Sequence, residues 1–334
     1  MTKSEMEFLE GPKQVAEGIY QIQLPTPFAV GPVNVYVIAA ECLTLVDAGP
    51  KTEEAWEALQ FGLEQIGYGV TDIQQVILTH HHVDHSGLLE RVRRACGANI
   101  YAHPFAVPYV EYDEQFMAFH DEFFEQLYRE CGVPQAGLEI ISKYRKKMDR
   151  YSEKTRIDAS LQHEQALPHL PEWQVIYTPG HSQSHLSLLR KEDRVMIAGD
   201  HVIKHISSNA FIEPPRDQSR SRPFTLVQYR TALEMVAAMD VQLILPGHGD
   251  PVTEHRELIT HRLQRNWDRT DTLRRFLESG EKTAYELSTL LFPQIYEKEL
   301  PLVLSETLGH IDLLTIVGQI EVRENNGVLY YSRG

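Results

Sequence analysis

The sequence has few cysteines, no long apolar run and no excess of basic residues. Its three cysteines, Cys42, Cys96 and Cys131, are odd in number and far apart, which argues against a disulfide framework and fits a reducing compartment. No apolar run approaches the ~18 residues that a membrane-spanning helix needs. The first residues, MTKSEMEFLEGPKQ, lack the apolar segment of a signal peptide. We therefore expect a cytoplasmic protein with no membrane partner.

Basic residues are outnumbered, because 32 Lys and Arg stand against 47 Asp and Glu, and the formal net charge is −15. So acidic a surface repels phosphate backbones and anionic membranes, which makes nucleic acid an unexpected partner. Internal repeats, low-complexity segments and the G-x-S-x-G motif of a serine nucleophile are also missing from the sequence. The 334 residues, 42% of them hydrophobic, suffice for one large domain and a smaller one.

Strand and helix patterns alternate along two parts of the chain, from about 15 to 103 and from about 171 to 253. Segments rich in Val, Ile and Tyr predict strands at 15–24, 33–40, 43–49, 74–80, 98–102, 173–177, 185–190, 194–200 and 241–249. Apolar residues spaced along one face predict a helix over 52–67, and further helices are expected over 86–96 and 226–239.

Residues from about 104 to 170 have a different character and form a helical insertion. An aromatic, acidic segment at 105–131 precedes a basic one at 143–156. The favoured interpretation is two helices whose opposite charges face each other or water. The alternative is an insertion that covers the substrate with an apolar lid of Phe and Tyr side chains.

Residues 254–334 predict three helices followed by a strand, an Asn-Gly turn and a strand. This order is typical of a winged helix, so we expect a catalytic domain over 1–253 and a winged-helix-like domain over 254–334. That second domain holds 10 Lys and Arg against 13 Asp and Glu, whereas a wing that reads nucleic acid is normally basic. We favour a wall of the active site or a dimer interface, with a second copy of the chain as partner.

Histidines gather where several predicted strands end. The stretch LTHHHVDHSG at 78–87 fits neither the helical nor the strand repeat, which indicates a loop around a common centre. TPGHSQSH, AGDH and LPGHGD follow three later strands. Corners at one edge of a sheet can converge, and imidazole and carboxylate groups there suit zinc.

These motifs, His-x-His-x-Asp-His and then Gly-His, Gly-Asp and Gly-His, resemble the metallo-β-lactamase superfamily over roughly 15–253. The resemblance implies an α+β fold, an αββα sandwich of two facing mixed sheets with helices outside. It implies that His80, His82 and His181 hold one metal. The second metal would be held by Asp84, His85 and His248, and Asp200 would bridge both.

The resemblance also bears on the metal and on the remaining histidines. Relatives that bind two irons carry glutamate where this sequence has His82, so two Zn²⁺ are expected, with Mn²⁺ or Fe²⁺ as alternatives. The motif leaves His81 free, as a structural or solvent-facing residue. His185, His201 and His205 lie near the expected ligands and would orient them or touch substrate. Among these, His205 is the candidate for substrate binding.

Such a site implies metal-assisted hydrolysis, in which a metal-bridging hydroxide attacks the substrate and Asp84 is the catalytic residue that orients it and passes on its proton. LPGHGDP at 245–251 looks like glyoxalase II and related thioesterase-like or lactonase-like hydrolases. Glyoxalase II itself fits less well, because its C-terminal helical region grips glutathione, and the chain looks most like lactamase-like hydrolases of the superfamily that carry a C-terminal winged helix. The expected substrate is therefore a small acyl compound, namely a carboxylic ester, thioester or lactone. The rival function is a phosphodiesterase or ribonuclease of the same superfamily, and a third is a non-catalytic metal-binding scaffold.

Overall fold

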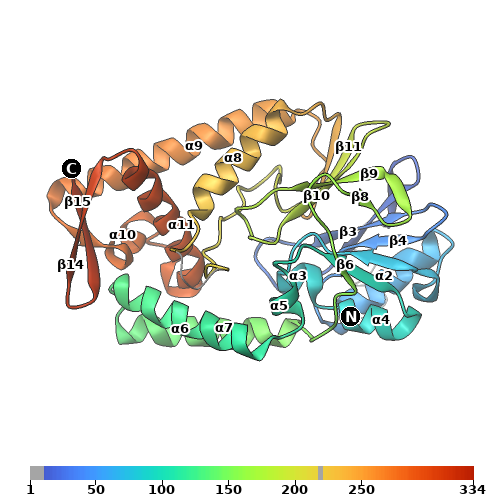
Figure 1. Ribbon diagram of the computed structural model, residues 1–334, viewed down its shortest axis with the longest axis horizontal. Helices are drawn as coiled ribbons and strands as arrows, with labels where there is room; N and C mark the ends of the chain where they lie inside the picture. The colour runs from blue at the N-terminus through green and yellow to red at the C-terminus, as the bar shows by residue number, and fades with distance from the viewer. Residues whose placement is uncertain (1–10, 217–220) are drawn as a thin grey trace.

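The computed structural model describes residues 11–216 and 221–334. Most of the N-terminal stretch in which we expect no signal peptide, residues 1–10, therefore lies outside the described part. No helix within the described ranges is both long and apolar enough to cross a membrane. Two facing sheets with helices on their outer sides occupy one end of the molecule, and helices with a small hairpin occupy the other (Figure 1).

The first sheet has seven strands, arranged in chain order. They are β1 (Lys13–Ala16), β2 (Ile19–Leu24), β3 (Val33–Ile38), β4 (Thr44–Val46), β5 (Gln75–Ile77), β6 (Asn99–Ala102) and β7 (Ala159–Ser160). β1 to β4 pair antiparallel, whereas β4 to β7 pair parallel. The parallel strands need crossover connections, and helices α2 (Glu53–Gln65) and α4 (Leu89–Cys96) supply two of them, with a short turn η1 (Val70–Asp72) after α2.

The second sheet has the order β12-β11-β10-β9-β8. Its strands are β8 (Ala166–Leu167), β9 (Leu170–Tyr177), β10 (Leu186–Arg190), β11 (Val195–Gly199) and β12 (Leu243–Pro246). Only β11 and β12 pair parallel, and helix α8 (Thr225–Ala238) connects them.

Three apolar cores hold the layers together. One lies between the two sheets, where Tyr36 and Ile77 of the first sheet meet Trp173 and Leu188 of the second. Another joins the first sheet to α2 and α4, and a third joins the second sheet to α8 and to α9 (His255–Phe276). The order helix, sheet, sheet, helix confirms the predicted sandwich.

The helix predicted over 86–96 is present but begins three residues later than predicted. A short helix α3 (Val83–Ser86) ends before Gly87, and α4 begins at Leu89. The backbone N–H of Leu88 donates to the Gly49 carbonyl, 3.0 Å away, instead of continuing the helical pattern. A Cβ at Gly87 would lie 2.2 Å from the carbonyl oxygen of Tyr151, so only glycine allows this close approach.

The C-terminal part contains the three predicted helices, α9, α10 (Ala284–Leu291) and α11 (Tyr296–Ile316), and the predicted hairpin of β14 (Ile320–Asn325) and β15 (Val328–Arg333). A turn η3 (Leu277–Ser279) follows α9. Asn326 and Gly327 form the hairpin turn with positive φ angles of 53° and 78°, as a two-residue turn of this type requires. A short strand β13 (Lys282–Thr283), not predicted, pairs with β15. The assignment of this part to a winged-helix domain stays a prediction.

The insertion consists of α5 (Val107–Val110), α6 (Glu114–Glu130), α7 (Gln135–Met148) and the turn η2 (Asp149–Tyr151). It lies along the C-terminal helices (Figure 1), and both share one apolar core that includes Tyr128, Ile141, Leu300 and Leu304. Aromatic side chains near the end of α6, among them Phe123 and Phe124, pack against that core. Phe123, Phe124 and Tyr128 therefore serve packing, and a lid formed by the other aromatic residues of the insertion stays a prediction.

The loop that leads to α8 is fixed to α11 by a nearly buried ion pair. Arg222 donates to both carboxylate oxygens of Asp312 at 2.7 and 2.6 Å, and the Asp312 side chain is 4% exposed. Arg222→Ala is expected to lower the free energy of unfolding by about 3 kcal/mol, because an uncompensated buried carboxylate remains. Urea unfolding measures it. The exposed pair of Arg194 and Asp240 is the control, since Arg194→Ala should cost less than about 1 kcal/mol. Equal losses would contradict this account.

Candidate metal centre

The loops after four strands bring the predicted ligands to one edge of the sandwich. His80 and His82 follow β5, His181 follows β9, Asp200 follows β11 directly, and His248 follows β12. Helix α3 adds Asp84 and His85. The structure thus brings together all seven residues singled out in the sequence, which are His80, His82, Asp84, His85, His181, Asp200 and His248.

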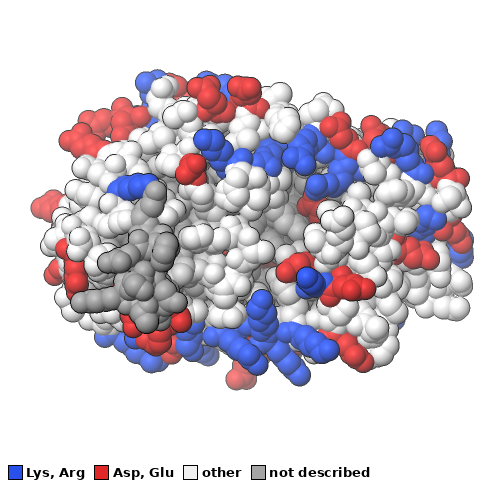
Figure 2. Space-filling view, turned by 180° about the vertical axis from the view of Figure 1, so that it is seen from behind, with Lys and Arg blue, Asp and Glu red and all other residues white. Residues whose placement is uncertain are grey.

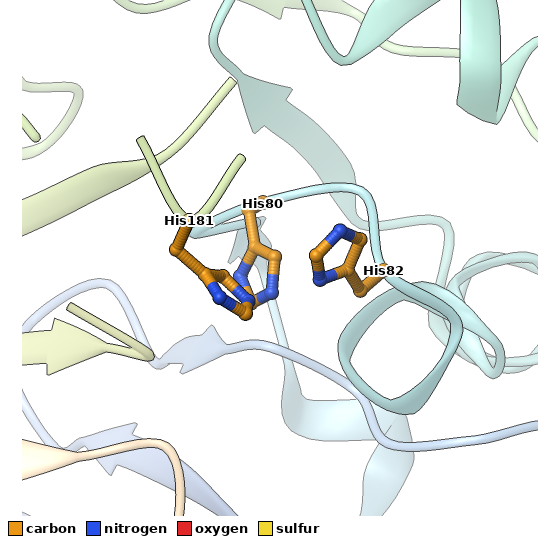
Figure 3. A group of neighbouring side chains, drawn as sticks. All are labelled: His80, His82 and His181. Atoms are coloured by element: carbon orange, nitrogen blue, oxygen red, sulfur yellow. The ribbon is translucent and has the colours of Figure 1, made fainter. Parts of the chain in front are cut away.

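Three imidazoles form the first group. His80, His82 and His181 each offer a ring nitrogen, and these nitrogens lie within 4.8 Å of one another. The ring centroid of His80 lies 4.6 Å from that of His82 and 4.9 Å from that of His181. Figure 3 shows the three rings facing one another, two from the loop after β5 and one from the loop after β9. Three convergent imidazoles at such spacing suit one divalent cation.

Asp84, His85 and His248 form the second group, also with ligand atoms within 4.8 Å of one another. Nε2 of His248 lies 3.4 Å from Oδ2 of Asp84. Asp200 lies between the two groups, since its Oδ2 is 3.5 Å from Nε2 of His181 and 3.7 Å from Nε2 of His248. Its Oδ1 is 3.3 Å from Nε2 of His85. Asp200 is therefore placed to contact cations in both groups.

Ring nitrogens at the centre lack partners in the protein. Nε2 of His80, His85, His181 and His248 and Oδ1 of Asp200 are buried, yet none forms a hydrogen bond within residues 11–216 and 221–334. Buried polar atoms are normally paired, so a group of orphaned donors and acceptors needs an explanation. Convergent nitrogen and carboxylate ligands without a protein partner fit divalent metal ions.

The opposite nitrogen of each of these rings is held by the protein. Nδ1 of His181 lies 2.8 Å from the carbonyl oxygen of Asn209, and Nδ1 of His248 lies 2.8 Å from that of Pro32. A carbonyl oxygen only accepts, so Nδ1 carries the proton in both rings and Nε2 keeps a free lone pair. Fixing the tautomer in this way is characteristic of metal-binding histidines.

Asp47 is a functional residue that the sequence reasoning missed. Its Oδ2 lies 2.8 Å from Nδ1 of His85 and accepts the Thr79 hydroxyl proton, also at 2.8 Å. Its Oδ1 accepts the backbone N–H of Thr79 at 2.7 Å, and the Thr79 hydroxyl lies 3.0 Å from Nδ1 of His80. Asp47 has a φ of 62°, a strained backbone conformation that tends to occur at functional sites. The only signal in the sequence is a carboxylate at the end of the LTLVD strand.

Asn209 links the site to the C-terminal helix, which sequence reasoning also missed. Its backbone carbonyl holds His181, while its side-chain amide donates to the Leu302 carbonyl of α11 at 2.7 Å. Three residues further on, the backbone N–H of Ile212 donates to the Ser305 hydroxyl of α11 at 3.2 Å. Helix α11 therefore supports a loop that orients one of the predicted ligands.

Burial and charge give His80, Asp84 and Asp200 the protonation states that cations require. Burial and the neighbouring imidazoles, of which His85 contributes most, hold the pKa of His80 well below its usual value, so its ring is neutral at pH 7. Burial raises the pKa of Asp84, but nearby His85 and His248 outweigh it and lower the pKa to about 2. Burial similarly raises the pKa of Asp200, whereas His248 and His85 hold it well below its usual value. Neutral imidazoles beside ionised carboxylates are the ligand forms that bind metal.

His85 shows how strongly the site attracts positive charge. Burial alone lowers the pKa of His85, but the carboxylates of Asp200, Asp47 and Asp84 raise it well above its usual value. Burial lowers the pKa of His248 too, yet Asp200 and Asp84 raise it overall. The cluster of carboxylates thus stabilises a cation at its centre, whether proton or metal ion.

His81 does not face the centre and instead joins two ligand loops. Its Nδ1 lies 2.9 Å from the Ser184 hydroxyl and 3.2 Å from the Ser182 hydroxyl, in the loop that carries His181. Its ring stacks on Tyr109 with a centroid distance of 3.7 Å. The Tyr109 hydroxyl donates to Glu213 at 3.2 Å, and the same carboxylate accepts the Gln183 N–H at 2.8 Å. The structural alternative predicted for His81 fits these contacts.

The three neighbouring histidines have different surroundings. His185 is fully buried, and its Nε2 accepts the backbone N–H of Asp200 at 3.1 Å, while its Nδ1 lies 2.8 Å from the Thr178 hydroxyl. It therefore orients Asp200. His201 is buried beside Tyr229. His205 is exposed, and its ring lies against Gly249, next to His248. Substrate contact by His205 stays a prediction.

The sequence of the chain is similar to a known protein family and to two metallo-hydrolases. The sequence model of a family described as the metallo-beta-lactamase superfamily matches residues 29–248. The chain is 39% identical over 303 residues to the probable metallo-hydrolase YqjP of Bacillus subtilis, covering 89% of this chain and 92% of that protein. It is 30% identical over 236 residues to the probable metallo-hydrolase YflN of the same organism, covering 66% and 81%.

Solved structures match nearly the whole chain in fold. The metallo-beta-lactamase family protein TTHA1429 from Thermus thermophilus matches with a TM-score of 0.82 and 25% identity, covering 96% of this chain and 100% of that one. A beta-lactamase domain protein from Burkholderia ambifaria matches with a TM-score of 0.77 and 22% identity, covering 97% and 94%. The second likeness shows a shared fold, which includes the C-terminal helices because nearly the whole chain is covered.

Proposed function

From the premise that the chain belongs to the metallo-β-lactamase superfamily, we propose that it is a dinuclear zinc hydrolase that cleaves a carboxylic ester, thioester or lactone. The family and its metallo-hydrolase relatives make it a metal-dependent hydrolase. Zinc as the metal, two as the number of ions, and an ester, thioester or lactone as the bond cleaved are what we propose. The observation that carries it is the set of buried, unpaired nitrogen and oxygen atoms that face one another at the centre.

The proposed ligands divide between two ions. His80, His82 and His181 would hold the first, Asp84, His85 and His248 would hold the second, and Asp200 lies between the two groups. All three side chains of the first group are imidazoles, and no cysteine is among the seven, a donor set that zinc accepts readily. Elemental analysis of the purified protein distinguishes zinc from manganese and iron.

The residues of the chain determine how such a site works. When bound, the cations acidify a water molecule and polarise the carbonyl oxygen of the substrate. The side chain of Asp84 is 15% exposed against 9% for Asp200, so Asp84 is the carboxylate that can reach both substrate and proton. It orients the attacking water and passes the proton to the leaving group. His185 holds Asp200 in place through the backbone N–H of that residue.

Aromatic side chains beside the ligands support an acyl substrate. Phe211 packs edge-on against His82 and His181, with centroid distances of 4.8 and 5.4 Å. Phe28 and Tyr151 contact each other edge-on at a centroid distance of 5.2 Å, and the Tyr151 backbone approaches Gly87, which follows α3. Apolar walls with a few polar groups are typical of sites for small organic ligands, and they favour an acyl chain over a sugar-phosphate backbone.

A substrate panel tests the proposed reaction class. The zinc-loaded protein is assayed with an acyl thioester, an acyl lactone, an aryl ester and bis-p-nitrophenyl phosphate. We expect kcat/KM for the best carbonyl compound to exceed that for the phosphodiester by about a hundredfold, which corresponds to roughly 3 kcal/mol of transition-state stabilisation. Faster cleavage of the phosphodiester would contradict the proposal and support the rival function.

A further inference from the structure

A stripe of positive side chains runs along one flank of α7 and its continuation η2. Successive residues of an α-helix are rotated by about 100°, so Lys143, Lys146, Lys147 and Arg150 lie on the same flank. We call these four residues the cationic stripe. Arg145 lies on the opposite flank and pairs with Asp121 of α6, so the stripe faces away from α6.

The cationic stripe is not neutralised by the protein. None of its four side chains forms an ion pair with any residue of the described ranges, although the chain as a whole carries a net charge of −15. Nearby Glu153 is already paired with Lys51 at 3.5 Å and with Arg94 at 3.2 Å. Burial raises the pKa of Glu299 in α11 and nearby Lys147 lowers it, but the two side chains form no ion pair within the described ranges.

Figure 2 shows Lys and Arg side chains gathered along the lower edge of the molecule, where α7 lies. Like charges spaced three or four residues apart on a helix repel each other and destabilise it. An acidic protein that keeps four unpaired cations in one stripe has a surface suited to anions.

The cationic stripe ends at η2, which lies beside the loop that follows the ligands of α3. The backbone of Tyr151 in η2 contacts Gly87, the residue that follows α3 and its ligands Asp84 and His85. Lys51 also holds η2 in place, because its backbone N–H donates to the Tyr151 carbonyl at 3.0 Å. Tyr144 lies on the packed face of α7. Burial raises the pKa of its phenol most, and the carboxylates of Glu299 and of nearby Asp84 raise it further.

We propose that the cationic stripe binds the phosphate groups of the substrate's leaving group. This inference rests on the proposed function and narrows the substrate to an acyl thioester or ester whose thiol or alcohol carrier bears phosphates, as a nucleotide-linked carrier does. The reaction is plain hydrolysis. The oxygen of water bonds to the acyl carbon, the carbon–sulfur or carbon–oxygen bond breaks, and the carrier leaves with the proton. The 14 residues of α7 span about 21 Å at 1.5 Å per residue, a length that an extended carrier can follow.

The test compares butyryl-coenzyme A with butyryl-N-acetylcysteamine. Both are thioesters of the same acyl group, but only the first carries phosphates. The variant Lys143→Ala/Lys146→Ala removes two exposed charges of the stripe. The matched control, Lys191→Ala/Arg275→Ala, removes two exposed charges from the β10–β11 turn and from the end of α9. The readouts are KM and kcat for both thioesters at several salt concentrations, and competition by inorganic pyrophosphate.

The measured ratio is the KM for the coenzyme A thioester divided by the KM for the neutral thioester. In the stripe variant this ratio should rise about tenfold, because each of the two lost charge contacts at the surface contributes roughly threefold. This ratio should not change in the control variant. The wild-type ratio should also rise with salt, and less steeply in the stripe variant, because fewer charges remain to be screened. Pyrophosphate should raise the KM of the coenzyme A thioester more in the wild type than in the stripe variant.

Other outcomes distinguish a failure of the phosphate site from a failure of the proposed function. Hydrolysis of both thioesters with the same KM ratio in wild type and stripe variant would overturn the phosphate site and leave the proposed function standing. Stripe-dependent binding of a single-stranded RNA oligonucleotide, without any change in that ratio, would overturn it in favour of nucleic acid. No hydrolysis of any thioester, aryl ester or lactone would overturn both.

Discussion

Replacing Asp84 by asparagine is expected to lower kcat for the best carbonyl substrate by about a thousandfold. A positioned acid–base group contributes roughly 10²–10⁴ to a rate, and the neutral amide of asparagine can neither accept the proton nor compensate a cation. Asp84 has a pKa of about 2, with His85 and His248 outweighing the effect of burial, so the carboxylate is fully ionised at neutral pH. Steady-state kinetics measures the loss.

Metal analysis of the same Asp84→Asn protein separates two causes of that loss. If both ions remain bound, the loss belongs to proton transfer and orientation. If about one ion per chain is lost, it belongs to the second metal position, as expected for a ligand that stands 3.4 Å from Nε2 of His248. The control is Asp240→Asn, which removes an exposed carboxylate paired with Arg194. An Asp84→Asn protein with full metal content and more than a tenth of the wild-type kcat would remove Asp84 from catalysis.

Replacing Asp47 by alanine should lower metal affinity by about ten- to a hundredfold, the usual effect of losing a group that orients a metal-binding histidine. Asp47 holds Nδ1 of His85 and both the backbone N–H and the hydroxyl of Thr79. Without it, the free energy of unfolding should also fall by about 2 kcal/mol or more, because buried donors lose their acceptor. Competition with a zinc indicator measures the affinity, and urea unfolding measures the stability.

Asp47→Asn is the conservative companion of this variant. Its amide oxygen can still accept the Thr79 N–H, but its amide nitrogen cannot accept a proton from His85, so we expect an intermediate loss of affinity. Asp72→Ala is the matched control, since it removes a carboxylate that accepts only the Gly69 N–H at the surface. Wild-type metal affinity in Asp47→Ala would show that Asp47 serves the backbone alone and not the ligand His85.

The sequence predicted the side chains that face the centre because their positions obey a local rule. His80, His181, Asp200 and His248 each come directly or shortly after an apolar strand, beside glycine or another histidine. Strand ends at one edge of a sheet converge whatever the details of packing. The sandwich was expected from the resemblance of these motifs to the metallo-β-lactamase superfamily, whereas the alternating strand and helix patterns by themselves indicate only layers of sheet and helix.

The residues that hold these ligands could not be predicted in the same way. Asp47 reaches His85 across 38 residues and Asn209 reaches His181 across 28, through contacts that exist only once the sheets are packed. The break between α3 and α4 depends on the approach of Tyr151 to Gly87, which comes from the insertion. The charge pattern of α6 and α7 predicted opposite charges that face each other or water, and among the described ion pairs only that of Arg145 and Asp121 joins the two helices.

The apolar core that α6 and α7 share with α10 and α11 constrains how this protein can be rebuilt. Leu127 and Ile141 of the insertion pack with Leu287 and Leu308 of the C-terminal helices, so neither segment has a complete interior of its own. If residues 254–334 were exchanged with those of a relative, apolar surface would be exposed in both resulting proteins. Exchanging residues 114–148 together with them would avoid this exposure. The two stretches, far apart in the chain, behave as one transferable module.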